Sequence, residues 1–381
     1  AYMSPELFKE MQTDTRGEFG GLGIEIGMES GVVKVISPIE GTPAEKAGIK
    51  AGDYIVKIGK EQVQGKSLME AVKLMRGPVG TTIDLTIRRK DVKKPLEFKV
   101  TRKIIEIQSV SSELISNEKN IGYLRLKSFN ENSDNQFLKS IKNFEKKSKI
   151  KGYVIDLRNN GGGSLQTVVD MAGYFIEDGP IVQVKSTGGK KQILFDVDNQ
   201  IEWNGALVLM VNEFSASASE ILAAAFQDYR RGIVLGSKQT YGKGTVQNMI
   251  DLNKIISGNT YGDLGAMKLT TDKFYRINGG STQLEGVKSD VIFPNRYSYI
   301  EVGEKDQENP LKWDKITPAK YETFIEEERF LSVIEKSNKR LENNPYVKLI
   351  DEQAKLIKER QENSEFTLNY ENLIKQKEIE N

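Results

Sequence analysis

The fold of this chain is decided by the stretch Ala206-Leu207-Val208-Leu209-Met210-Val211-Asn212-Glu213-Phe214-Ser215-Ala216-Ser217-Ala218-Ser219-Glu220-Ile221-Leu222-Ala223-Ala224-Ala225-Phe226. An apolar run comes first, a serine-rich turn follows, and strong helix formers come last. That order predicts a buried strand over residues 206–211 and a helix over 218–229. Upstream, an apolar run over 152–157, a glycine-rich turn and a helix over 164–176 repeat the pattern. Together the two units predict an α/β layer structure for residues 104–300.

Ser217 lies in the turn and fits two roles. The string Ser217-Ala218-Ser219-Glu220 matches the capping box S-x-x-E, so helix capping alone explains the serine. A helix N-terminus after a buried strand is also where enzymes place a nucleophile, because its free N–H groups and positive dipole end stabilise an oxyanion. In that role the N–H of Ala218 would be one oxyanion donor. The motif by itself does not separate the two roles.

A nucleophilic serine in this chain needs an unusual base, because the sequence contains no histidine and no cysteine. Lys243 is the obvious candidate, as the one charged residue in Tyr241-Gly242-Lys243-Gly244-Thr245-Val246-Gln247. If residues 245–247 are extended, Gln247 shares a face with Lys243 and orients its ammonium group. Burial would then lower the pKa of the lysine from roughly 10.4 toward neutrality. The alternative is an ordinary surface lysine on a strand.

The same lysine does not belong to a phosphate-binding loop. That fingerprint requires a glycine at position 237, where the chain has Ser237. It also requires Ser or Thr directly after the lysine, where the chain has Gly244.

A third element is the turn Asp156-Leu157-Arg158-Asn159-Asn160-Gly161-Gly162-Gly163. Its three glycines allow close approach of the backbone, and their N–H groups are suited to binding an anion at the start of a helix. A flexible connection between strand and helix explains the turn equally well.

The residue composition and the expected secondary structure differ on the two sides of this region. Residues 18–103 alternate short strands, expected over 32–36, 54–58 and 82–87, with Gly and Pro turns. A helix over 67–75 carries apolar residues at Leu68, Val72 and Met75. Residues 1–17 form a polar lead-in. From 301 onward the chain is rich in Lys and Glu, and helices are expected roughly over 318–342 and 345–362.

Composition excludes several classes of function. The 381 residues include 55 Lys plus Arg and 54 Asp plus Glu, a net charge of +1, which argues against nucleic acid or an anionic membrane as main partner. No apolar run approaches the roughly 18 residues of a transmembrane helix, and no signal peptide is visible, so the chain reads as a mature or trimmed form. Without histidine or cysteine, we expect no metal site and no cofactor.

Taken in order, three strings resemble the signatures of the C-terminal processing peptidases, or tail-specific proteases: Leu157-Arg158-Asn159-Asn160-Gly161-Gly162-Gly163, Ser215-Ala216-Ser217-Ala218-Ser219-Glu220 and Gly242-Lys243-Gly244-Thr245-Val246-Gln247. The string Gly41-Thr42-Pro43-Ala44-Glu45-Lys46-Ala47-Gly48-Ile49-Lys50-Ala51-Gly52-Asp53 looks like the turn and helix of a PDZ domain. The resemblance implies an α/β protease core with crotonase- or ClpP-like layers, an inserted β-rich PDZ domain and a helical C-terminal segment. We expect these at residues 104–300, 18–103 and 301–381.

The resemblance also implies roles for individual residues. Ser217 would be the nucleophile, Lys243 the general base and Gln247 its orienting partner. The N–H groups of Gly163 and Ala218 would form the oxyanion hole. The spacing between serine and lysine is one residue longer than is usual in the family, which indicates an insertion within 237–240.

By the same resemblance, the substrates are proteins or peptides with free, apolar C-termini. The loop Gly21-Leu22-Gly23-Ile24 would hold the terminal carboxylate, and Leu68, Val72 and Met75 would hold the last side chain. The family further implies a periplasmic or cell-envelope location and a possible adaptor or homo-oligomer. Residues 303–305 and 309–314 resemble the larger Gram-negative members, so we expect a fragment of such a protein.

Two other functions fit parts of the sequence. A non-catalytic PDZ scaffold or pseudoprotease would need the PDZ segment alone, but Ser217, Lys243 and Gln247 are all present. An acyl transferase or hydratase could use a crotonase-like core. A small thioester, however, has no use for a domain that binds C-terminal carboxylates.

Overall fold

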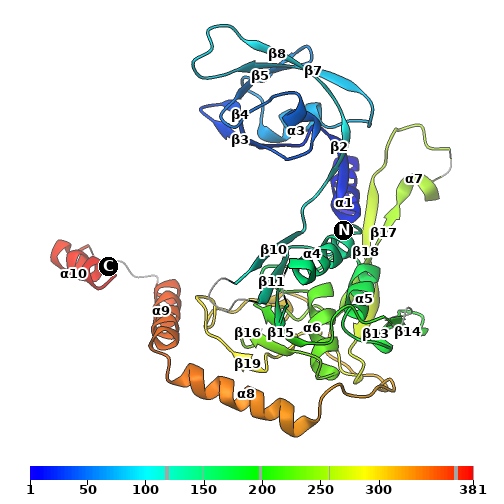
Figure 1. Cartoon of the computed structure of the whole chain (residues 1–381), viewed down its shortest axis with the longest axis vertical. Helices are drawn as coiled ribbons and strands as arrows, with labels where there is room; N and C mark the ends of the chain where they lie inside the picture. Colours follow the sequence, from blue (N-terminus) through cyan, green and yellow to red (C-terminus); the bar gives the residue numbers. More distant parts are fainter. Residues whose placement is uncertain (116–119, 148, 197–199, 257, 364–367, 381) are drawn as a thin grey trace.

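The structure, a computed structural model, describes residues 1–115, 120–147, 149–196, 200–256, 258–363 and 368–380. Figure 1 shows three parts: a small β-rich domain, a larger α/β core and a helical arm that leaves the core near the C-terminus. All three parts agree with the fold class that the sequence predicts.

The small domain is a six-stranded sheet with two helices. Its strand order is β3-β4-β5-β7-β8, with β6 paired to β5. Helix α3 begins after Ser67, whose hydroxyl and N–H form a capping box with Glu70. Its elements are β3 (Ile24–Glu29), β4 (Val32–Pro38), α2 (Pro43–Lys46), β5 (Tyr54–Ile58), β6 (Glu61–Gln62), α3 (Leu68–Met75), β7 (Thr82–Arg88) and β8 (Leu96–Thr101). The three strands and the helix expected from the sequence are therefore present.

A buried ion pair ties two parts of this domain together. Asp53 is 1% exposed, and its two carboxylate oxygens accept hydrogen bonds from Arg89 Nε at 2.7 Å and Nη2 at 2.8 Å. The same guanidinium donates to the carbonyl of Gly48 at 2.9 Å. Burial alone would raise the pKa of Asp53, but the hydrogen bonds from Arg89 and from the N–H of Lys50 outweigh it and hold the pKa below its usual value.

The domain joins the core through a two-stranded neck. Strands β2 (Glu18–Gly21) and β9 (Lys103–Glu106) pair in antiparallel register, with Glu18 opposite Glu106. The chain therefore enters and leaves the small domain at neighbouring points, as an inserted domain does.

The first residues are more ordered than a polar lead-in. Strand β1 (Tyr2–Met3) pairs with β18 (Ala266–Tyr275), and α1 (Pro5–Arg16) follows, capped by the Ser4 hydroxyl. Met3 and Phe8 are buried against Ala266 in a small apolar cluster. Met3 on β1, together with Phe8 and Met11 three residues apart on α1, thus attaches this segment to the core.

The main sheet of the core is mostly parallel. Its order is β10-β11-β12-β15-β16-β19, and only the β10–β11 pair is antiparallel. Its strands are β10 (Val110–Leu114), β11 (Ile121–Leu126), β12 (Gly152–Asp156), β15 (Ala206–Val211), β16 (Ile233–Gly236) and β19 (Val291–Ile292). The two predicted strand–turn–helix units supply neighbouring strands, β12 and β15, so their turns emerge at the same edge of the sheet.

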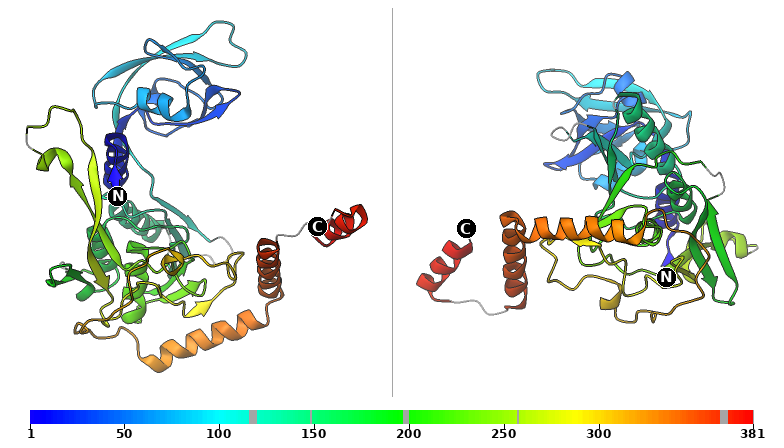
Figure 2. Two further views of the ribbon diagram at one scale, coloured as in Figure 1. Left: turned by 180° about the vertical axis from the view of Figure 1, so that it is seen from behind. Right: turned by 60° about the horizontal axis from the view of Figure 1, so that its bottom comes forward.

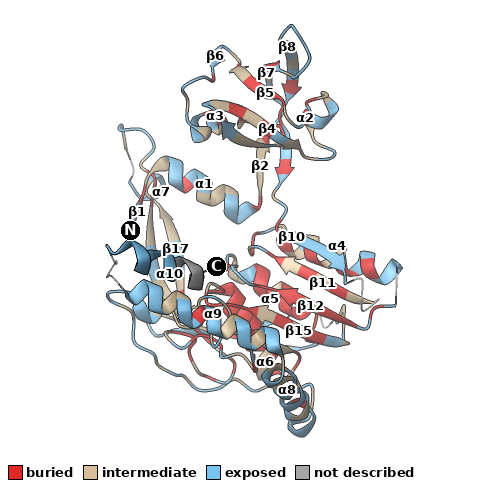
Figure 3. Cartoon of the chain, turned by 90° about the vertical axis from the view of Figure 1, so that its left-hand side faces the viewer, coloured by how far each residue is buried: buried red, intermediate tan, exposed pale blue. Residues whose placement is uncertain are grey.

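A second sheet and a layer of helices complete the core. Helices α5 and α6 contact each other, and both contact β13 of the second sheet, while α6 also contacts β16 of the main sheet. Their apolar faces share one cluster with both sheets, and Figure 3 shows this buried interior in red. The elements are α4 (Ser133–Lys147), α5 (Leu165–Gly173), β13 (Gly179–Ser186), β14 (Lys191–Asp196), α6 (Ala218–Asp228), β17 (Thr245–Asp251), α7 (Leu252–Ile255) and β18 (Ala266–Tyr275).

The arm begins later than the sequence suggests. It comprises η2 (Glu304–Asp306), α8 (Glu327–Glu342), α9 (Pro345–Glu362) and α10 (Tyr370–Glu380). The helix expected from residue 318 starts only at 327, because the preceding residues bond to the core: Ala319 N–H donates to Ile277 and Phe324 N–H to Tyr229. Figure 2 shows α9 and α10 extending beyond the core. Among the described residues, no helix is long and apolar enough to cross a membrane.

We predict that Arg89→Met destabilises the small domain by about 3 kcal/mol, because it leaves the Asp53 carboxylate buried without a counter-charge. Hydrogen exchange of the β5 and β7 amides measures this locally. Arg88→Met is the matched control, since Arg88 is the exposed neighbour of Arg89 and the last residue of β7. Equal protection in the two variants would contradict the prediction.

Candidate active site

The predicted catalytic residues meet in one cleft of about 730 Å³. The cleft lies where the turns after β12 and β15 approach the start of β17. It is lined by every residue that the sequence assigned to catalysis: Gly163, Ser217, Ala218, Lys243 and Gln247. These residues come from three separate stretches of the chain, so the fold alone brings them together.

Of the three serines in the turn, only Ser217 has a free hydroxyl. The buried Ser215 hydroxyl donates to the carbonyl of Leu157 at 2.8 Å, and the buried Ser219 hydroxyl donates to the carbonyl of Asn160 at 2.9 Å. Ser217 and Glu220 stand in a capping-box arrangement, but the N–H of Glu220 bonds to the Ser217 carbonyl at 2.8 Å and Ser217 Oγ makes no side-chain cap hydrogen bond. Its place at the start of α6 therefore leaves the Ser217 hydroxyl available for a second role. The two flanking serines attach the turn to its neighbour, and the middle one faces the cleft.

The backbone at Ser217 is held in a rarely populated conformation. Its φ is 57° and its ψ is −114°, outside the regions that L-residues favour. Such geometry persists only where surrounding contacts enforce it, and it is concentrated at functional sites. Here the enforcing contacts are the N–H of Ser217 to Glu220 Oε2 at 2.7 Å and the N–H of Ala216 to the carbonyl of Asn160 at 3.0 Å.

The glycine turn packs directly on the serine. A Cβ on Gly162 would lie 2.8 Å from Ser217 Cβ and 2.9 Å from the Ala218 nitrogen, and its φ of +102° also favours glycine. The Gly162 N–H donates to Asn160 Oδ1 at 2.9 Å. Among the described residues, the N–H groups of Gly161, Gly163 and Ala218 have no acceptor. Donors without acceptors beside a free hydroxyl are what an oxyanion hole requires.

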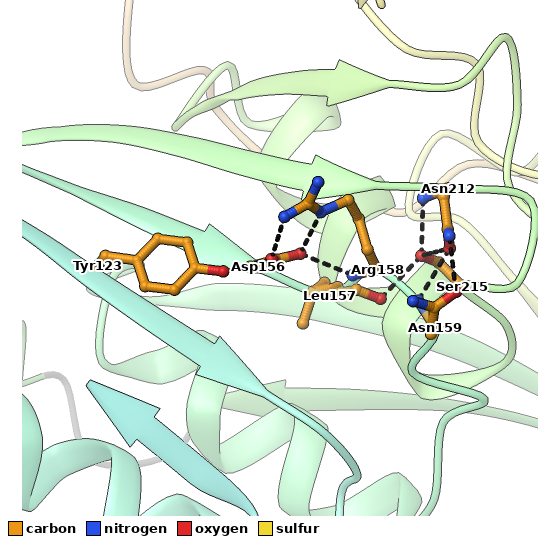
Figure 4. A network of polar contacts seen from close by, with 7 residues as sticks. All are labelled: Tyr123, Asp156, Leu157, Arg158, Asn159, Asn212 and Ser215. Atoms are coloured by element: carbon orange, nitrogen blue, oxygen red, sulfur yellow. Dashed lines mark hydrogen bonds and ion pairs between the residues drawn. The ribbon is translucent and has the colours of Figure 1, made fainter. Parts of the chain in front are cut away.

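A polar network fixes the glycine turn from behind (Figure 4). Asp156 is fully buried and accepts hydrogen bonds from Tyr123 Oη at 2.5 Å and from Arg158 Nη2 at 2.7 Å. Farther along the turn, Asn159 N–H donates to Asn212 Oδ1 at 2.9 Å, and Asn212 Nδ2 returns a bond to Asn159 Oδ1 at 2.8 Å. The ends of β12 and β15 are thereby locked together, which sets the position of Ser217 relative to the glycines.

Glu220 joins the serine turn to the lysine loop. Its fully buried carboxylate accepts four hydrogen bonds, from Thr240 Oγ1 at 2.6 Å and from the N–H groups of Ser217 at 2.7 Å, Gly242 at 2.7 Å and Lys243 at 3.0 Å. Burial raises the pKa of Glu220 to about 7, and these four hydrogen bonds oppose the rise. The ionised form, which accepts all four bonds, therefore predominates above about pH 7.

Lys243 lies in the loop before β17, partly buried in the cleft wall. Its Nζ donates to Gln247 Oε1 at 3.4 Å, so the two residues are in contact as the sequence suggested. Burial lowers the pKa of Lys243, Lys268 lowers it further, and Glu304 and Glu220 oppose the shift. Within the described residues Lys243 makes no hydrogen bond with Ser217, although both line the same cleft.

The small domain has a second, smaller groove of about 110 Å³ between β3 and α3. Of the seven residues predicted to bind a peptide, six line it: Gly21, Leu22, Gly23, Ile24, Val72 and Met75. Leu68, in the first turn of α3, does not line this groove. Phe19 and Arg76 do, with the Arg76 guanidinium 4.4 Å from the Phe19 ring centroid. In the sheet order β3 is an edge strand, which leaves one side open for pairing.

Comparison with known proteins gives three family matches along the chain. Residues 20–100 match the PDZ domain, residues 120–293 match peptidase family S41, and residues 297–381 match the C-terminal domain of tail specific protease. A carboxy-terminal-processing protease of Bartonella bacilliformis is 42% identical over 325 residues, which are 82% of this chain and 71% of that protein. The chain belongs to peptidase family S41.

Two further proteins are similar to the chain. A tail-specific protease of Haemophilus influenzae is 34% identical over 97% of this chain but only 55% of its own length, so the chain spans little more than half of that protein. Among solved structures, the photosystem II D1 C-terminal processing protease is 29% identical and covers 76% of both chains with a TM-score of 0.44. The family matches and the two curated relatives confirm the resemblance to C-terminal processing and tail-specific proteases.

Sequence reasoning missed the residues that support the site from behind. Glu220 was visible only as the last position of a capping box, and Asn160 only as a turn residue. Helix α1 was not expected, yet Met11 and Asp14 line the cleft. Buried carboxylates are rare without partners, so a glutamate inside the apolar run that follows Ser217 was the available signal. The described residues contain no cluster of His, Cys, Asp or Glu suited to a metal ion.

We predict that Glu220→Gln lowers stability by about 2–4 kcal/mol and greatly reduces activity. The carboxamide nitrogen cannot accept the hydrogen bonds that one carboxylate oxygen accepts, which leaves buried donors unsatisfied. Thermal denaturation and peptide hydrolysis measure the two effects. Glu131→Gln, at an exposed position, is the control. A variant as stable and active as this control would refute the role assigned to Glu220.

Proposed function

We propose that this chain is a serine endopeptidase that cleaves proteins near their C-termini, with Ser217 as nucleophile and Lys243 as general base. The observation that carries the proposal is the single free serine hydroxyl in a cleft that also holds a lysine of lowered pKa. Membership of a protease family supports the reaction class. No histidine is present to take the base's role.

In the first step, neutral Lys243 accepts the Ser217 proton while Ser217 Oγ attacks the peptide carbonyl. For this transfer Nζ must come within hydrogen-bond reach of Ser217 Oγ, and in this structure it donates to Gln247 Oε1 at 3.4 Å. The resulting ammonium then donates the proton to the leaving amine. In the second step Lys243 takes a proton from water, which attacks the acyl-enzyme, and returns it to Ser217.

The negative charge that develops on the carbonyl oxygen is stabilised by the N–H groups of Ala218 and Gly163. Both groups line the cleft and lack an acceptor among the described residues. Ala218 is also the first residue of α6, so the positive end of the helix dipole adds to the field at this point. Gln247 orients Lys243 between transfers.

The small domain would select substrates by their C-termini. An extended peptide adds to the open edge of β3, with its terminal carboxylate at the Gly21-Leu22-Gly23-Ile24 loop and its last side chain against Val72 and Met75. Arg76, at the rim of this groove, adds a positive charge for the carboxylate. A periplasmic or cell-envelope location and an adaptor or second copy as partner are further parts of this proposal, and they rest on the family.

A non-catalytic peptide-binding role is the alternative to exclude. It predicts that the cleft residues are dispensable, whereas the proposed mechanism requires them. Hydrolysis assays on the purified chain decide between the two.

We predict that Ser217→Ala and Lys243→Met each reduce kcat/KM at least about 10³-fold, because neither attack nor proton transfer has another group to perform it. In the wild-type chain kcat/KM should rise with pH, since only neutral Lys243 is a base, and the lowered pKa brings the rise below pH 10.5. Activity that survives Ser217→Ala would reject the nucleophile. A pH profile unchanged in Lys243→Met would reject the base.

We also predict that peptides with an amidated C-terminus are cleaved about tenfold more slowly at low concentration than matched peptides with a free, apolar C-terminus. Amidation removes the charge that the β3 groove binds. Ile24→Asp, in the groove, should reduce the difference between the two substrates. Equal rates for both in the wild-type chain would argue against recognition by the small domain.

A further inference from the structure

The loop that carries Lys243 is held by hydrogen bonds at every backbone group. In residues 241–244 all N–H groups donate and all carbonyls accept. On the side of the nucleophile, Ser215 and Glu220 accept from the first three N–H groups. The remaining partners, on the opposite side, are Phe274, Thr282, Gln283, Leu284 and Glu304.

Gln283 is the central residue of this second side. Its side chain is fully buried, and its Oε1 accepts the N–H of Gly244 at 2.8 Å. The contact is close: a Cβ on Gly244 would lie 2.7 Å from the Gln283 nitrogen. Gln283 Nε2 donates to Glu304 Oε1 at 3.3 Å and to the carbonyl of Leu311 at 3.1 Å. Gln283 does not line the cleft, so it acts on Lys243 only through the loop.

Glu304 also bonds directly to the loop. Its N–H donates to the carbonyl of Tyr241 at 2.8 Å, and nearby Gln307 Nε2 donates to Tyr241 Oη at 2.7 Å. These residues lie beyond residue 293, where the match to the peptidase family ends, and within the match to the C-terminal domain. The segment that leads into the helical arm therefore completes the support of a loop in the peptidase core.

We propose that Gln283 and Glu304 are positioning residues for Lys243, through which the C-terminal segment fixes the catalytic base. This inference rests on the proposed function, because it takes Lys243 as the base. Gln283 sets the loop backbone, and Glu304 holds Gln283 and Tyr241 while placing a negative charge near the ammonium. Displacement of residues 303–311 would then alter both the position and the basicity of Lys243.

The charges around Lys243 make this testable. Lys268 of β18 lowers the pKa of Lys243, and Glu304 and Glu220 raise it. Within the part of the chain that the structure describes, Asp14 of α1 also lines the cleft, the Tyr241 hydroxyl belongs to the loop, and Lys273 of β18 lies opposite Thr245. Removing the charge of Glu304 therefore lowers the pKa of Lys243. Glu220 also titrates in this region, so activity alone does not isolate the lysine.

The experiment follows Lys243 directly by NMR titration of the full chain with ¹³C-labelled lysine, its signal assigned by loss in Lys243→Met. In Glu304→Gln, which keeps an acceptor for Gln283, we expect the Lys243 midpoint to fall by about half a pH unit. The pH midpoint of the acidic limb of the kcat/KM profile should fall by the same amount. Glu308→Gln is the matched control, because Glu308 is exposed in the same segment.

A second variant tests the backbone contact. Gln283→Met retains the side-chain volume but leaves the Gly244 N–H without its acceptor, and we expect kcat to fall about tenfold with KM little changed.

A Lys243 titration midpoint that is the same in Glu304→Gln as in Glu308→Gln would overturn the inference. If the wild-type chain cuts no peptide, the proposed function fails. The NMR titration still measures whether the charge of Glu304 shifts the pKa of Lys243.

Discussion

The candidate active site depends on one buried carboxylate, that of Glu220. It accepts the N–H of Ser217 and the N–H groups of Gly242 and Lys243, so one side chain sets the distance between the proposed nucleophile and the loop of the proposed base. Burying a charge is costly, and four donors are needed to offset the loss of water. The carboxylate can remain there only while both loops are in place. The two halves of the site are consequently formed together or not at all.

The remaining contacts extend this arrangement to the rest of the core. The network around Asp156 and Asn212 locks the glycine turn to the serine turn, and the buried hydroxyls of Ser215 and Ser219 bond to the same turn. The strained backbone of Ser217 is a consequence, because its neighbours are fixed on both sides. The serine turn is thus held by several hydrogen bonds, whereas Lys243 Nζ donates to Gln247 Oε1 at 3.4 Å. Preorganised donors beside the proposed base are compatible with two-step acyl transfer.

The sequence predicted most elements because their patterns are local. The strand over 206–211 and the helix beginning at 218 follow from an apolar run and a capping box, and β15 and α6 occupy those positions. The predictions failed where tertiary contacts override local preference. Residues 318–326 have helical composition but bond to Ile277 and Tyr229 instead. Helix α1 is a different case: it carries local signals, Ser4 and Pro5 at its start and Gly17 after its end, and Phe8 packs near Ala266. Leu68 lies in the first turn of α3, whereas Val72 and Met75, farther along the helix, line the groove.

By itself, the sequence determined the chemistry available to this protein: no histidine, one lysine among glycines, three serines at a helix start and a family signature that joins them. Only the tertiary structure decided which serine hydroxyl is free, which N–H groups lack acceptors, and that Glu220, Gln283 and Glu304 hold the lysine loop. The physical reason is that residue types and local spacing fix propensities. Hydrogen-bond satisfaction is decided only when segments distant in sequence are packed together and water is excluded.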